Sequence, residues 1–165
     1  MKILRQCLAM AVAATALCAC ATRPAFEDAP PTRSVAPYQA ARDGETHMDK
    51  SVMWGGMVLE VNNFEHHSEI EILAYPLDEK QRPKLESADQ GRFIALMAGF
   101  ADPATLPRGR FVTLIGTVTG DRHGPVRGED YVWPEVDVKR LHLWPQDFRE
   151  SKSRVSVGFG FGFGG

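Results

Sequence analysis

The stretch FVTLIGTVT, residues 111–119, is the clearest strand signal in the sequence. Side chains of a β-strand alternate between two faces, so residues two apart share a face. Val112, Leu114 and Val118 then form one apolar face. The opposite face would carry Thr113, Ile115, Thr117 and Thr119. We therefore predict a strand over residues 111–119.

Similar segments lie on both sides of this strand, separated by glycine- and proline-containing turns. Residues 52–61 predict a first strand, with Gly55-Gly56 marking a bend or bulge. In a second strand, residues 69–77, the side chains of Ile70, Ile72 and Ala74 share one face and those of Glu69 and Glu71 the other. A final strand is predicted at 131–143, broken or edged at Pro134. Turns or loops are expected at residues 78–84, 102–109 and 120–128.

Residues 91–100 fit either a strand or a short helix by pattern alone, although Phe93, Ile94 and the bounding glycines favour a strand. With this segment, residues 48–148 hold five or six short strands and no convincing helix. We predict an all-β domain, a small OB-like partly open barrel. The order of its strands does not follow from the sequence.

The N-terminal residues have the features of a secretory signal. Lys2 and Arg5 precede an apolar run of about 10 residues, which is too short for a membrane-spanning helix. The run ends in Leu17-Cys18-Ala19-Cys20, which resembles a lipobox. Cys18 fits poorly as the lipid acceptor, because bulky Leu17 would then adjoin the cleavage site. We predict a lipoprotein signal peptide at residues 1–19 and lipidation of Cys20.

The rest of the chain divides into three parts. Residues 20–47 hold four prolines and few aliphatic side chains, which predicts a lipidated, disordered tether with a reach of roughly 30 Å. Residues 48–148 form the β domain. The charged and then Gly/Phe-rich tail, residues 149–165, fits either an apolar strand added to a sheet edge or a disordered segment. Removal of Cys7 and Cys18 with the signal leaves no cysteine for a disulfide.

Charge and the residue after Cys20 bear on partners and location. The formal net charge of −2 becomes −4 once Lys2 and Arg5 are removed. That balance argues against a nucleic-acid partner. The expected partner is a membrane, reached through the lipid. Ala21 stands where aspartate would signal inner-membrane retention, so the outer membrane is the predicted destination.

One polar cluster has residue types that bind metals. In Glu65-His66-His67-Ser68-Glu69, a strand would place His67, Glu69 and Glu71 on one face, where they would offer nitrogen and oxygen to zinc or nickel. The alternative is a solvated hairpin loop followed by a strand with one charged face. We favour the loop and predict no cofactor.

Two further groups of residues concern ligands and catalysis. Four aromatic side chains would form either a ligand platform or, as we favour, the core and its rim: Trp54, Tyr131, Trp133 and Trp144. The chain has no Gly-x-Ser-x-Gly motif for a serine nucleophile. Its neighbouring carboxylates are more simply surface charges. We predict no catalytic residues and no enzymatic activity.

An ordered set of short motifs resembles the Slp family of outer-membrane lipoproteins, of the starvation-inducible type. The motifs are WGGMV (54–58), SEIEI (68–72), YPLD (75–78), GRFIA (91–95), GFADP (99–103), RFVTLIGTVTG (110–120), GEDYVWPEV (128–136) and LHLWP (141–145). Ala101 and Arg127 depart from the usual pattern. The resemblance implies an envelope role in stationary phase or stress. It carries over no active site, and Cys20 alone transfers with a defined chemical role.

Overall fold

The structure, a computed structural model, describes residues 24–28 and 35–148. The predicted signal peptide, Cys20 and the tail from residue 149 lie outside the described residues. Two short helices come first, α2 (Pro37–Arg42) and the 3-10 helix η2 (Gly44–His47). The strands that follow are β1 (Ser51–Asn63), β2 (His67–Ala74), β3 (Arg92–Ala98), β4 (Phe111–Val126) and β5 (Glu129–Leu143).

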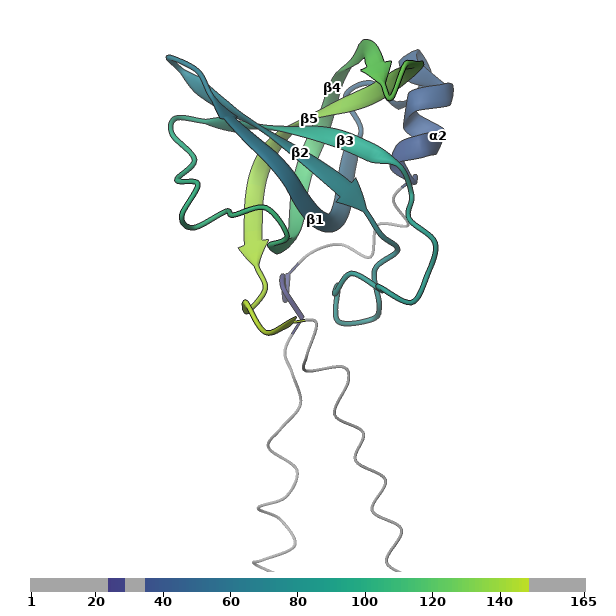
Figure 1. Ribbon diagram of the computed structural model, residues 1–165. Helices are drawn as coiled ribbons and strands as arrows, with labels where there is room; N and C mark the ends of the chain where they lie inside the picture. Colours follow the sequence, from purple (N-terminus) through teal and green to yellow (C-terminus); the bar gives the residue numbers. More distant parts are fainter. Residues whose placement is uncertain (1–23, 29–34, 149–165) are drawn as a thin grey trace, which may run out of the picture.

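The five strands form one closed barrel in the order β1-β2-β3-β5-β4, with β4 pairing back to β1 (Figure 1). Among the described strands, β3 and β5 pair in parallel and the other neighbours are antiparallel. The prediction of an all-β barrel is confirmed, and residues 92–98 are a strand. The barrel is closed rather than partly open, because β4 completes the ring against β1.

The alternating faces predicted from the sequence are confirmed in β2 and β4. Ile70, Ile72 and Ala74 point into the core, while Glu69 and Glu71 lie on the outer face. Val112, Leu114 and Val118 of β4 are buried. They join side chains from every other strand in one cluster that includes Val58, Phe93, Ala95 and Val136.

The longest strands exceed their predicted bounds. Residues 120–128 were expected to be a turn, but β4 continues to Val126 and β5 begins at Glu129. Only Arg127 and Gly128 form the turn, both with positive φ, 53° and 90°. A two-residue turn of this type matches the twist of the flanking strands. Gly120, Gly124 and Pro125 resemble turn residues in the sequence, yet they lie within the hairpin.

Two other features of the strands also differ from expectation. Gly55-Gly56 is not a bulge, since the register shift of β1 lies between Val58 and Glu60. A Cβ at Gly56 would collide with the backbone of Leu73, so this glycine permits close approach of β1 and β2. Strand β5 is unbroken at Pro134, whose missing N–H falls just before the pairing with β3 begins at Glu135.

Residues 35–47 are not part of a disordered tether, because they pack on the barrel. The indole Nε1 of Trp54 donates to the carbonyl oxygen of Val35 at 2.6 Å. Ala36 and Ala40 are buried, and Gln39 Oε1 accepts the N–H of Ala36 at 3.0 Å. Pro37 opens α2, which proline favours because its fixed φ suits the first helical position. The folded domain therefore begins before the predicted boundary at residue 48.

A second apolar cluster lies at one end of the barrel. Phe111, Trp144 and Phe148 are its buried members, and Ala25, Met57, Tyr75 and Leu85 pack against them. Trp144 Nε1 donates to Thr113 Oγ1 at 2.9 Å, which gives a partner to the fully buried hydroxyl of a threonine on the outer side of β4. The cluster brings the first and last described segments of the chain together.

Candidate functional site

Three residues singled out from the sequence share the outer face of β2. His67, Glu69 and Glu71 alternate with Ser68, Ile70 and Ile72, whose side chains are buried. The face is the one that an OB barrel uses, with its β1–β2 and β4–β5 loops, to hold oligomeric ligands. Here the extended β4–β5 hairpin contributes two side chains to it, Arg122 and Trp133, which are directly opposite each other in the ladder.

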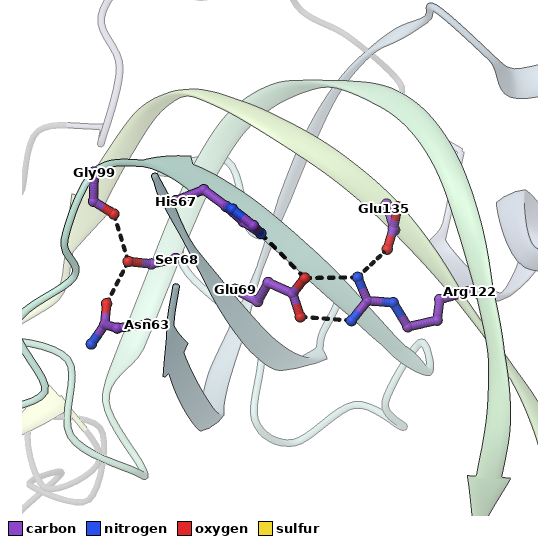
Figure 2. Close-up of polar contacts among 7 residues, drawn as sticks. All are labelled: Asn63, His67, Ser68, Glu69, Gly99, Arg122 and Glu135. Atoms are coloured by element: carbon purple, nitrogen blue, oxygen red, sulfur yellow. Dashed lines mark hydrogen bonds and ion pairs between the residues drawn. The ribbon is translucent and has the colours of Figure 1, made fainter. Parts of the chain in front are cut away.

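Arg122 forms the central contact of this face (Figure 2). Its Nη1 and Nη2 donate to Glu69 Oε2 and Oε1 at 2.6 and 2.8 Å. Nη2 also lies 2.7 Å from Glu135 Oε1. The two carboxylate side chains are only 14% and 19% exposed. A guanidinium that bridges two largely covered carboxylates fixes the hairpin to β2 with geometric specificity.

These contacts also shift the ionisation of the groups. The hydrogen bond from Arg122 lowers the pKa of Glu69, against an opposing effect of partial burial. The hydrogen bond to Glu69 raises the pKa of Arg122. Both groups are therefore charged over the working range of pH. Because the site holds its own opposite charges at bonding distance, it needs no external ion to balance Glu69.

Glu71 is held by a second set of contacts. Its Oε1 accepts from Arg92 Nη1 at 2.9 Å and from Trp133 Nε1 at 3.1 Å. Tyr131 lies edge-on to Trp133 with 4.8 Å between ring centroids, and its hydroxyl accepts the backbone N–H of Arg92 at 2.6 Å. Gly124 lies under the indole, where a Cβ would lie 3.3 Å from Trp133 Cζ3. The aromatic pair therefore covers the face in a defined position.

A small hollow of about 180 Å³ remains between the hairpin and the barrel. It is lined by Asn62, Glu69, Glu71, Ile94, Arg122 and Trp133. The hollow combines one guanidinium, two carboxylates and an indole face. It can offer hydrogen bonds and stacking to a small polar molecule, but it has no room for an oligonucleotide.

The suggested metal ligands do not converge. His67 Nε2 lies 3.4 Å from Glu69 Oε1. The imidazole is stacked on the Phe64 ring, with 4.9 Å between the ring centroids. Within residues 24–28 and 35–148, no three His, Cys, Asp or Glu side chains are placed to hold a metal ion. Arg122 and Arg92 occupy the oxygen atoms that a metal would need. The interpretation of an exposed hairpin loop before a strand with one charged face agrees with the structure. Glu65 and His66 lie in the exposed β1–β2 turn, and β2 begins at the half-exposed His67.

The model of the outer membrane lipoprotein Slp family matches residues 17–160. This chain belongs to the Slp family. It is therefore an outer-membrane lipoprotein, as the lipobox and Ala21 predicted.

Individual relatives agree with the family match. Outer membrane protein Slp of Escherichia coli is 33% identical over 59% of this chain and 52% of its own length. The uncharacterized lipoprotein YeaY of E. coli is 31% identical over 79% of this chain and 69% of its own. This chain thus spans about half the length of the first of these relatives. Among solved structures, a small single-stranded DNA-binding protein from Streptomyces coelicolor superposes with a TM-score of 0.37 at 10% sequence identity. The superposition covers 58% of this chain and 94% of that protein, and a TM-score this low supports no conclusion.

The structure places the other sequence candidates of this Slp-family chain in two groups. Trp54 and Trp144 are buried in the two apolar clusters, at 3% and 4% exposure. Trp133 lines the hollow, and Tyr131 packs edge-on against Trp133. Cys20 lies outside the described residues, so its lipidation remains a prediction. No helix in the described ranges is long and apolar enough to cross a membrane.

Two features of the site were missed from the sequence. Arg122 lay in a segment interpreted as a turn. The structure places it in β4, beyond a register shift between Val118 and Gly120 that the simple alternation of residues 111–119 does not predict. The buried Ser68 hydroxyl was also missed. It lies 2.5 Å from Asn63 Oδ1 and 2.7 Å from the Gly99 carbonyl oxygen (Figure 2). It also accepts the N–H of Ala101 at 2.8 Å. This network holds the loop after β3 against the β1–β2 turn.

Proposed function

We propose that this Slp-family lipoprotein is a non-enzymatic, periplasm-facing module of the outer membrane, anchored through lipid on Cys20. It acts in envelope maintenance or in adaptation to starvation and stress through interactions with other envelope components. The observation that carries this proposal is the contact of Arg122 with Glu69 and Glu135. The barrel's own hairpin covers the face on which an OB barrel would hold an oligomeric ligand.

The side chains with catalytic potential support the same proposal. Glu69 and Glu71 are paired with arginines, and the Ser68 hydroxyl is buried at 0% exposure in a structural network. A general base needs a free lone pair within reach of a substrate proton, and a nucleophile needs access to the substrate. These residues are used instead to hold the barrel, the hairpin and the loops in place.

The test is complementation of a deletion strain. The strain should grow normally in rich medium and lose fitness in stationary phase or at acidic pH. Cys20→Ser should abolish complementation because the protein loses its anchor. His67→Ala, a change at the start of β2 beside Glu69, should complement fully. Normal fitness of the deletion strain under every stress tested would contradict the stress role, and full activity of the Cys20→Ser variant would contradict the anchor.

A second candidate function rests on the hollow of about 180 Å³ itself. Its arginine, indole and carboxylates suit a small zwitterionic or polar ligand, which would have to exchange hydrogen bonds with Arg122 or Trp133. A panel of such compounds should then raise the melting temperature of the wild-type protein. The Trp133→Leu variant should lose that rise. No rise with any compound would favour the interaction module.

A further inference from the structure

The first described segment, residues 24–28, is attached to the side of the barrel near one end. Phe26 is 8% exposed, and its ring meets that of His142 edge-on at 6.3 Å. The guanidinium of Arg140 lies 4.9 Å over the Phe26 ring and pairs with Asp28 at 2.8 Å. Gln81 holds the backbone: its Oε1 accepts the Phe26 N–H at 2.7 Å and its Nε2 donates to the Phe26 carbonyl oxygen at 3.0 Å. These contacts, the N-terminal clamp, determine where the chain enters the fold.

The clamp belongs to one end of the molecule, which we define as the base: residues 24–28, 77–85, 107–111 and 144–148. Ala25 and Leu85 pack against the cluster of Phe111, Trp144 and Phe148. Thr113 Oγ1 donates to the carbonyl oxygen of Gln81 at 2.8 Å, which ties loop 77–85 to β4. In Figure 1 the purple N-terminal segment and the yellow-green end of the described chain lie together at the lower end, and the β4–β5 turn lies at the upper end.

Chain length then limits the distance between the lipid and the base. Cys20 precedes Phe26 by six residues, and an extended chain spans at most about 3.5 Å per residue. The two Cα atoms are therefore at most about 21 Å apart. Without the clamp, the first attachment would be at Val35, and the limit would rise to about 50 Å. This step rests on the proposed lipidation of Cys20.

We infer that the base of the barrel faces the outer membrane and rests against its phospholipid headgroups, held there by the N-terminal clamp. The turn between β4 and β5 then points away from the lipid surface. The hollow beside Arg122 opens toward the soluble compartment and envelope components located there. The clamp thus sets which face of the module is presented to a partner.

The side chains of the base suit a phosphate-bearing surface. Arg108 and Arg110 line a hollow of about 180 Å³ together with Phe111 and Pro145. In the described part of the chain, Arg110 Nε is the buried side-chain nitrogen that lacks a hydrogen-bond partner. Guanidinium N–H groups that line this hollow can donate charge-assisted hydrogen bonds to a phosphate oxygen.

Loop 77–85 adds further cations to the base. Arg82 is paired with Asp78 at 2.8 Å, so the remaining charged side chains of residues 77–84 are Lys80, Lys84 and Glu79. Lysines and arginines near a bilayer are attracted to anionic headgroups. The loop lies beside the clamp, since Gln81 belongs to both. The base also contains five acidic side chains, Glu27, Asp28, Asp78, Glu79 and Asp147, which balance its five basic ones. The proposed contact with headgroups therefore rests on the position of the clamp and on the placement of individual cations, not on a net positive charge.

The experiment uses the full lipidated protein, purified from membranes and reconstituted into phosphatidylethanolamine–phosphatidylglycerol vesicles with a headgroup-attached nitroxide quencher. A fluorophore is placed on Glu79→Cys at the base or on Glu129→Cys beside the β4–β5 turn, both exposed positions. Cys20 is blocked by its lipid, so each variant has one reactive thiol. Quenching should be at least threefold stronger at position 79 than at position 129.

Phe26→Ala should bring this quenching ratio toward one, because the clamp is lost and the tether lengthens. Phe100→Ala is the matched control, since Phe100 is 72% exposed, and should leave the ratio unchanged. Circular dichroism confirms that each variant is folded. Equal quenching at both positions, stronger quenching at 129, or an unchanged ratio in Phe26→Ala would overturn the inference. Absence of fatty acid on Cys20 would instead overturn the proposed anchoring.

Discussion

Arg122 donates to both carboxylate oxygens of Glu69 across 53 residues of sequence, and this pair joins the far half of the β4–β5 hairpin to β2. A second carboxylate, Glu135, lies 2.7 Å from the same guanidinium. The arrangement makes Arg122 the counter-charge of two neighbouring acids. Its loss would leave these acids close together without a cation.

The first prediction concerns this bridge. Arg122→Gln should lower the free energy of unfolding by about 1–2 kcal/mol, because Glu69 and Glu135 then repel each other in a partly covered position. Urea denaturation measures the change. Arg127→Gln, in the exposed turn of the same hairpin, should change stability by less than about 0.5 kcal/mol. Equal effects of the two substitutions would contradict the role assigned to Arg122.

The second prediction is a pH dependence of the same pair. The folded-state pKa of Glu69 lies below its ordinary value of 4.5. The carboxylate therefore stabilises the fold above the unfolded pKa, and this contribution is lost as pH falls through the folded pKa. The stability difference between the wild type and Glu69→Gln should be largest near pH 7 and should shrink below pH 4.5. Urea denaturation at pH 7 and pH 3 measures it, and a constant difference would contradict the assignment.

The third prediction concerns the close approach of β1 and β2. Gly56→Ala should destabilise the barrel by about 2 kcal/mol or more, because the added Cβ meets the backbone of Leu73 rather than a movable side chain. Gly120→Ala is the matched control. Its Cβ would lie 3.6 Å from Glu135 Oε2, an ordinary contact. Thermal melting followed by circular dichroism should separate the two variants clearly, and similar melting temperatures would show that the strands adjust freely.

The fourth prediction concerns the β4–β5 turn. Arg127 has a φ of 53°, in the left-handed region that asparagine tolerates better than arginine. Arg127→Asn creates the Asn-Gly pair favoured in two-residue hairpin turns and should stabilise the protein by roughly 0.5 kcal/mol. Arg127→Val should destabilise it, because a β-branched residue fits this conformation poorly. The order Asn, Arg, Val in melting temperature is the expected result, and a different order would contradict the turn geometry.

The sequence by itself determined the strand identities and the family. The period of two in residues 111–119 and in residues 69–74 is a local property, and it correctly assigned Leu114 and Ile72 to the core. The ordered motifs identified the Slp family without a structure. The lipobox is equally local, and Cys20 could be proposed from four residues alone.

Only the tertiary structure decided what these strands bring together. Contacts between distant segments determine the strand order and the closure of the barrel. They also determine the pairing of Arg122 with Glu69 and the packing of Phe26 against Arg140. The periodicity of a single strand carries no information about its neighbours. Residues 120–126 resembled a loop in the sequence. Because the actual turn has only two residues, both with positive φ, this segment belongs to β4 and Arg122 lies over β2. The same reason explains why Phe26 and Ala36 were assigned to the tether. Their burial depends on the barrel surface against which they pack, and that surface cannot be read from the sequence.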